Sequence, residues 1–158
     1  SAQKRDGAEA ARIKMAGAGK MTAKEDRKNA GNRKGETRLM VRKADVKIVE
    51  NLGGGKGTAY VHHIVSKDEM LGHGRLYARV VLPPGSSVGW HQHVRDTEPY
   101  YILKGEADFI DNDKTVTKVG PGDCCIIQVG QFHSLENNSD SDVEFMALIY
   151  NEAGFLYE

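Results

Sequence analysis

The stretch that decides the fold reads Gly85-Ser-Ser-Val-Gly-Trp-His91-Gln-His93-Val-Arg-Asp-Thr-Glu98-Pro-Tyr-Tyr-Ile-Leu-Lys-Gly105. His91 and His93 are two positions apart, and in a β-strand this spacing turns both imidazoles to the same face. Glu98 lies at an odd offset from both histidines, so it would face away in one unbroken strand. We therefore predict a turn over 94–97 and a returning strand over 98–103, which aims the carboxylate at the histidine pair.

A second stretch carries one more isolated histidine. It reads Gly120-Pro-Gly-Asp-Cys-Cys-Ile-Ile-Gln-Val-Gly130-Gln-Phe-His133-Ser-Leu-Glu-Asn137. His133 follows an apolar run bounded by glycines, and it would complete a set of three nitrogen ligands and one oxygen ligand. Lone histidines at such positions are more often ordinary strand residues, and it is the combination of all four residues that favours a metal site.

Together the two stretches resemble the two motifs of the cupin superfamily. The first stretch matches the spacing of the first motif at every position, and the second has Gly122, Gly130, His133 and Asn137 in place, with Gln128 where that motif usually has proline. The resemblance covers roughly residues 40–150. It implies an all-β fold, the cupin double-stranded β-helix or jelly-roll barrel, and it implies that the metal ligands are His91, His93, Glu98 and His133.

The resemblance implies one divalent transition metal per chain. Three imidazoles and a carboxylate leave two open positions around an octahedral ion, which favours Mn²⁺ or Fe²⁺. The ligand types do not exclude Zn²⁺, Ni²⁺, Co²⁺ or Cu²⁺.

The charge of the chain is divided unevenly along its length. Residues 1–38 hold 11 Lys and Arg against 5 Asp and Glu, whereas residues 39–158 hold 11 against 17. We predict a basic, largely disordered N-terminal arm over 1–38 and a cupin domain over 39–158. The arm is either an extension that precedes a start at Met40 or a polyanion-binding tail. No aromatic residue interleaves its charges, which disfavours a nucleic-acid partner.

The cysteines and the hydropathy bear on the compartment. Cys124 and Cys125 are adjacent, so no disulfide framework is predicted and a reducing, cytoplasmic location is expected. No apolar run reaches the length of a membrane helix, and we expect no membrane partner.

Short β-prone runs separated by turn signals follow residue 38 and predict an antiparallel sandwich or barrel. A first strand is expected within 39–49, and the glycine-rich segment 53–57 is expected to be a flexible hairpin loop rather than a phosphate-binding loop. In the next strand, over 58–65, His62 and His63 must face opposite sides. Further strands are expected over 74–82, 107–110, 115–119 and 143–150.

Two further residues are candidates for catalysis. If Tyr77 and Arg79 lie on the inner face of their strand, Arg79 can clamp a substrate carboxylate, and Tyr100, on the face of Glu98, can donate a proton. The alternatives are a solvated or interface Arg79 and a Tyr100 that only packs. Trp90 alternates away from the ligands and is expected in the core or a subunit interface.

The resemblance extends to compact bacterial cupins grouped with oxalate decarboxylases and phosphomannose isomerases. Oxalate decarboxylases carry an arginine three residues before the first ligand histidine, and Val88 stands there in this chain. The leading hypothesis is a metal-dependent decarboxylase, oxygenase or isomerase that acts on a small oxygenated or carboxylate substrate. The alternatives are a non-catalytic metal-bound sensor or ligand-binding protein and a sugar-phosphate isomerase. A homodimer that pairs through the first strand is also expected.

Overall fold

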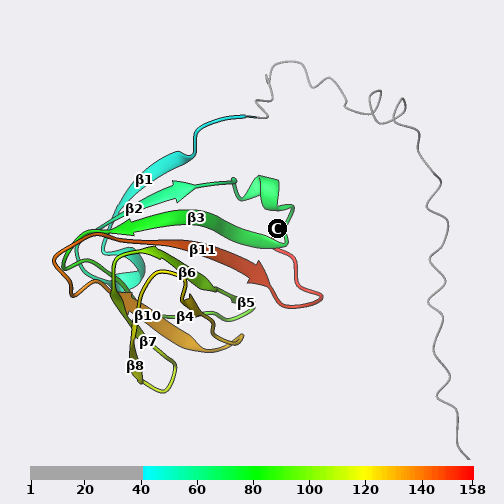
Figure 1. The fold of residues 1–158 in the computed structure, drawn as a ribbon. Helices are drawn as coiled ribbons and strands as arrows, with labels where there is room; N and C mark the ends of the chain where they lie inside the picture. Colours follow the sequence, from blue (N-terminus) through cyan, green and yellow to red (C-terminus); the bar gives the residue numbers. More distant parts are fainter. Residues whose placement is uncertain (1–40) are drawn as a thin grey trace, which may run out of the picture. The chain divides into compact units, whose positions relative to one another are not determined.

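The computed structural model describes residues 41–158 (Figure 1). Our predictions for the arm over 1–38, and for the beginning of the first strand at residues 39 and 40, lie outside this part of the chain. No helix in residues 41–158 is both long enough and apolar enough to cross a lipid bilayer.

Antiparallel strands form two sheets, as Figure 1 shows, which confirms the all-β prediction. The larger sheet has seven strands: β1 (Asp45–Glu50), β2 (Thr58–His63), β3 (Gly74–Leu82), β11 (Val143–Asn151), β6 (Tyr100–Lys104) and β9 (Cys124–Cys125) in spatial order, with β5 (Asp96–Thr97) paired to β11. The smaller sheet has four: β4 (Ser87–Gln92), β10 (Phe132–Glu136), β7 (Ala107–Ile110) and β8 (Val116–Val119). Two single 3₁₀ turns, η1 (Leu52–Gly54) and η2 (Asp68–Met70), lie in the connections.

The core lies between the two sheets and follows the two-residue period of the strands. In β3, Ala78, Val80 and Leu82 are buried while the residues between them are more exposed. In β11, the buried members are Val143, Phe145, Ala147 and Ile149. Because alternate side chains of a strand point to opposite faces, this pattern assigns the inner face of each strand.

The glycine-rich loop joins β1 to β2 as the predicted hairpin, but it is packed against β4 instead of being free. A Cβ placed on Gly89 would lie 2.3 Å from the carbonyl oxygen of Gly53, and one placed on Gly55 would lie 2.3 Å from that of Ser87. Backbone therefore meets backbone here, at a distance that only glycine permits. The loop closes one side of the space between the sheets.

Two residues of the second motif have structural roles in the chain. The buried side chain of Asn137 donates to the carbonyl oxygens of Leu82 and Ser141, both at 2.8 Å, and so ties β3 to the connection before β11. The backbone N–H of Gln128 donates to Oε1 of Gln131 at 2.9 Å, a bond that proline could not make. This bond stabilises the turn without the usual proline.

Both cysteines are free thiols, as predicted. Cys124 is exposed, whereas burial, with a contribution from the charge of Asp123, raises the pKa of Cys125 to about 12. Cys125 therefore behaves as a small apolar core residue.

Candidate metal centre

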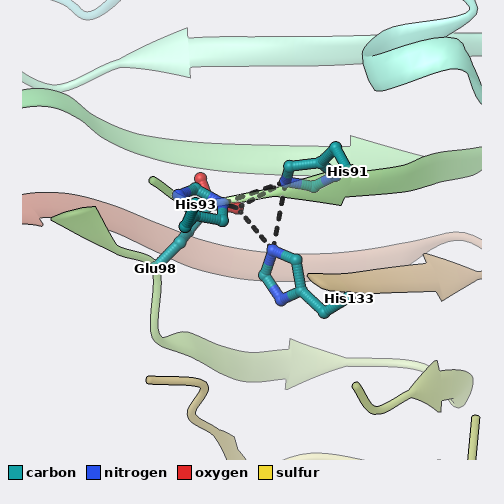
Figure 2. A group of neighbouring side chains, drawn as sticks. All are labelled: His91, His93, Glu98 and His133. Carbon is teal, nitrogen blue, oxygen red and sulfur yellow. Dashed lines mark hydrogen bonds and ion pairs between the residues drawn. The ribbon is translucent and has the colours of Figure 1, made fainter. Parts of the chain in front are cut away.

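The four predicted ligand residues converge on one point between the sheets (Figure 2). His91 lies in β4, His93 follows its end, and His133 lies in β10 of the same sheet. Glu98 lies between β5 and β6, which belong to the larger sheet. The predicted turn over 94–97 contains the short strand β5, and the returning strand begins at Tyr100 rather than at Glu98. One ligand atom from each residue lies within 4.8 Å of the others.

The converging atoms are the three imidazole Nε2 nitrogens and one carboxylate oxygen. His91 Nε2 lies 3.0 Å from that of His93 and 3.1 Å from that of His133. Glu98 Oε1 lies 3.4 Å from His133 Nε2 and 3.7 and 3.8 Å from those of His93 and His91. His91 is the partly exposed member of the group, and the other three residues are buried.

The other nitrogen of two of these rings fixes the tautomer. His91 Nδ1 lies 2.7 Å from the carbonyl oxygen of Gly89, and His93 Nδ1 lies 2.6 Å from Asp96 Oδ1. A carbonyl oxygen and a carboxylate accept hydrogen bonds, so both Nδ1 atoms carry the proton. Each Nε2 therefore turns a lone pair, not a hydrogen, toward its neighbour.

This arrangement fits a metal ion. Two nitrogen lone pairs that face each other at 3.0 Å repel unless a cation lies between them. Nitrogen ligands on adjacent corners around an ion, each about 2.0–2.1 Å from it, are about 3 Å apart. The nitrogen spacing in this chain matches that value.

The charge of Glu98 suits the same purpose. Burial alone would raise the pKa of this carboxyl, but the polar groups around it, His133 first and then His91, His93 and Tyr100, outweigh burial and hold the pKa well below its usual value. Glu98 is therefore ionised and supplies the negative charge that a divalent ion needs among neutral imidazoles.

Comparison with known proteins agrees with the fold. A family model described as "Cupin domain" matches residues 78–149. The "Oxalate-binding protein" of Thermotoga maritima is 44% identical over 115 residues, which make up 72% of this chain and 94% of that protein. The chain belongs to the cupin family.

Solved structures show the same fold. This cupin matches the crystal structure of a "predicted oxalate decarboxylase" from Thermotoga maritima with a TM-score of 0.67 and 41% identity, over 72% of this chain and all of that one. A polyketide cyclase from Streptomyces resistomycificus gives a TM-score of 0.57 at 20% identity, over 77% of this chain and 89% of that one. The second likeness shows the fold alone.

In this cupin, Tyr100 stacks on a ligand ring. Its ring lies 4.9 Å from that of His133 at an interplanar angle of 15°, and its hydroxyl lies 3.4 Å from His133 Nε2. Burial, and then the charge of Glu98, raises the pKa of Tyr100 well above its usual value, so the hydroxyl stays protonated. The Nδ1 atom of His133 is buried without a hydrogen-bond partner in the structure.

Sequence reasoning missed a support for His93. Asp96 accepts from His93 Nδ1 through one oxygen, and through the other it accepts from Arg75 Nε at 2.9 Å and from the hydroxyl of Tyr157. Burial would raise the pKa of Asp96. The hydrogen bond from Tyr157, followed by those from Arg75 and His93, outweighs burial and lowers this pKa. The available signal was the position of Asp96, three residues after His93 inside the turn, where a short carboxylate can reach back.

The structure places Arg79 outside the site. The inner face of β3 is the one with Ala78 and Val80, so Arg79 lies on the outer face, where Nη1 donates to Glu144 Oε1 at 3.0 Å and Nη2 lies beside the ring of His62. The predicted contact of Arg79 with a ligand carboxylate in the cavity is therefore wrong.

A cavity of ≈ 310 Å³ adjoins the ligand residues. His91, His93, Glu98 and Tyr100 line one part of it, and the η1 loop with residues of β1, β2 and β3 lines the rest. His63 also lines it, while His62 contacts Arg79 on the outer face, which confirms that the two histidines of β2 face opposite sides.

Trp90 was predicted to lie in the core or in a subunit interface, and it is partly exposed. Its ring stacks on Phe132 of β10, with centroids 5.6 Å apart, and Lys114 Nζ lies 3.2 Å above it. Trp90 thus covers the outer surface of the smaller sheet and does not contact the cavity.

Proposed function

We propose that this protein binds one divalent transition metal through His91, His93, Glu98 and His133, and that the metal holds a small carboxylate ligand such as oxalate. The observation that carries the proposal is the convergence of three Nε2 nitrogens and an ionised carboxylate oxygen, in which His91 and His93 turn lone pairs toward each other at 3.0 Å. The similarity to a relative named "Oxalate-binding protein" supports the choice of ligand.

A six-coordinate ion held by these four residues would keep two positions for the oxygens of a chelating acid, and Mn²⁺ or Fe²⁺ would suit this donor set best. The residues of the chain then have separate tasks. Asp96 keeps the proton of His93 on Nδ1, and Glu98 balances the charge. The apolar wall of the cavity excludes water from the bound acid.

A metal-dependent enzyme is the second candidate, and Tyr100 is the observation that favours it. Its protonated hydroxyl lies beside the ligand atoms and lines the cavity, where it can donate a proton to a reacting oxygen or carbon. With Arg79 excluded from the cavity, Tyr100 is the remaining candidate from the sequence for a catalytic role.

Metal analysis of purified protein tests the proposal. We expect about one equivalent of divalent metal in the wild type and a large loss in His93→Ala, while His73→Ala, which removes a histidine outside the site, should keep its metal. Equal metal contents in wild type and His93→Ala would overturn the proposal.

Titration of the loaded protein with oxalate separates the two candidates. Binding without formation of formate and carbon dioxide favours a binding protein, whereas turnover that Tyr100→Phe abolishes without loss of metal favours an enzyme.

A further inference from the structure

The cavity has a larger apolar lining than a two-carbon acid can contact. Most of the side chains that line it are apolar, and they come from four strands of the larger sheet and from η1, among them Val49, Leu52, Val61, Leu76, Val80 and Ile149. Oxalate has no carbon chain to contact such a wall. A ligand that fills the cavity therefore needs an apolar body.

The part of the cavity that adjoins a second pocket is basic. Arg75 and His63 line this cavity and also a second, adjoining pocket of ≈ 290 Å³, which Arg42, Lys47 and Lys67 line as well. Arg42 is paired with Glu69 at 2.5 Å and Arg75 with Asp96 at 2.9 Å. Asp45 is the carboxylate that lines the second pocket, so the two lysines outnumber it.

Lys47 is the cation best placed for an incoming anion. It lies on β1 two residues before Val49, so the two side chains share the face of the strand that lines the cavity. Within residues 41–158, no carboxylate forms an ion pair with Lys47. Lys47 and His63 both line the second pocket, and burial first and the charge of Lys47 second lower the pKa of His63.

We propose that the ligand of this cupin is an acid with three parts: an oxygen-chelating head at the metal, an apolar body along the cavity, and a second carboxylate bound by Lys47 and Arg75. The inference rests on the proposed metal site. Arg75 serves two groups at once, because its Nε atom holds Asp96 and its terminal nitrogens form no ion pair with any other carboxylate of residues 41–158. Lys47 is therefore the residue to test.

A matched pair of 2-oxo acids provides the test. 2-Oxoadipate and 2-oxohexanoate share the chelating head and the six-carbon chain, and only the former has a second carboxylate. Their affinities for Mn²⁺-loaded protein are to be measured by calorimetry, with pyruvate as the head without a body. The metal content of every sample is measured separately.

We expect wild type to bind 2-oxoadipate at least about tenfold more tightly than 2-oxohexanoate, since a charge-assisted hydrogen bond is lost in the second acid. Lys47→Met, which keeps the apolar stem, should bring this ratio close to one. Lys118→Met removes a lysine paired with Asp108 on the smaller sheet and should leave the ratio unchanged. 2-Oxohexanoate should also bind at least about fivefold more tightly than pyruvate, because its extra methylene groups contact the apolar wall.

Two results would overturn the inference while leaving the metal site intact. One is equal affinity for the two six-carbon acids in metal-loaded wild type, and the other is an unchanged ratio in Lys47→Met. Wild type that holds no metal, or loaded protein that binds neither oxalate nor pyruvate, would instead overturn the proposed function and the inference with it.

Discussion

Asp96 is a side chain outside the proposed ligand set that orients one of its members. It fixes the proton of His93 on Nδ1 and orients the ring, while Arg75 and Tyr157 hold its own second oxygen. Such carboxylates commonly contribute 10- to 100-fold to metal affinity.

Asp96→Asn should therefore lower metal affinity by about 10- to 100-fold while the protein stays folded. The amide has the shape of the carboxylate but loses its charge, so it stabilises a neutral, proton-bearing Nδ1 less well. Competition with a metal-binding dye measures the change. Asp108→Asn, at a carboxylate paired with Lys118 away from the site, is the matched control. Equal affinities in the two variants would mean that Asp96 does not support His93.

Protons should compete with the metal for His93. Burial tends to lower the pKa of this imidazole, but Glu98 and Asp96 outweigh burial and raise it. A raised pKa means that the metal-free site takes up a proton on Nε2 at a higher pH than the ordinary value of about 6.5. As the pH is lowered, metal affinity should therefore begin to fall before pH 6.5 is reached. Below the raised pKa it should drop by about tenfold per pH unit. Dye competition between pH 8 and pH 5.5 measures this, and a constant affinity over that range would contradict it.

His91, His93 and Glu98 were predictable from the sequence because strand alternation and one turn bring them together, whereas His133, in a later strand, was expected beside them because the second stretch resembles the second cupin motif. The position of Arg79 was not predictable. Its strand has apolar residues on both faces, with Ala78 and Val80 on one and Val81 on the other, so the sequence alone left the inner face undecided. The burial of Ala78, Val80 and Leu82 in the folded chain shows which face meets the core.

At the scale of the elements, the connection between β1 and β2 behaves differently from the flexible loop that its glycines suggested. It contacts β4 along the backbone and contributes Leu52 and Gly53 to the cavity wall. The sequence could not reveal this, because Gly89 and the loop are more than 30 residues apart and a close approach of two backbones leaves no hydrophobic pattern.

Gly89→Ala should destabilise the protein by about 1–3 kcal/mol, since the new methyl group would lie 2.3 Å from the carbonyl oxygen of Gly53. Urea denaturation measures the free energy of unfolding. Gly120→Ala is the control, because the nearest atom to its Cβ is 3.8 Å away and its change should stay within about 0.5 kcal/mol. Similar stabilities for the two variants would show that the loop can move away from β4 at little cost.

At the scale of the whole molecule, β1 lies at the edge of the larger sheet and, among the strands of residues 41–158, pairs with β2 alone. Its outward side chains include Ile48, 66% exposed, and Val46, 45% exposed. An exposed edge strand with apolar side chains favours pairing with another chain. The homodimer therefore stays a prediction, with β1 as its interface.

Light scattering at micromolar concentration should give about twice the mass of the 17.4 kDa chain. Ile48→Lys should shift it toward the monomer, because a charge would be buried in the interface. Val116→Lys places the same charge at a 60% exposed position on β8 of the other sheet and should leave the dimer intact. A monomeric wild type would rule the dimer out.

The origin of the ligands in two different sheets has a consequence for folding. His91 and His133 lie in the smaller sheet and Glu98 lies between strands of the larger one, so a bound ion cross-links the two layers. The unfolded chain holds no such site, and free ion at 100 times its dissociation constant should add about 2.7 kcal/mol to the free energy of unfolding. The melting temperature of wild type should then rise with added metal and fall with a chelator, and that of His93→Ala should respond to neither. Under the proposed function, the abundance of the folded protein in a cell would then report how much of the ion the cell has available.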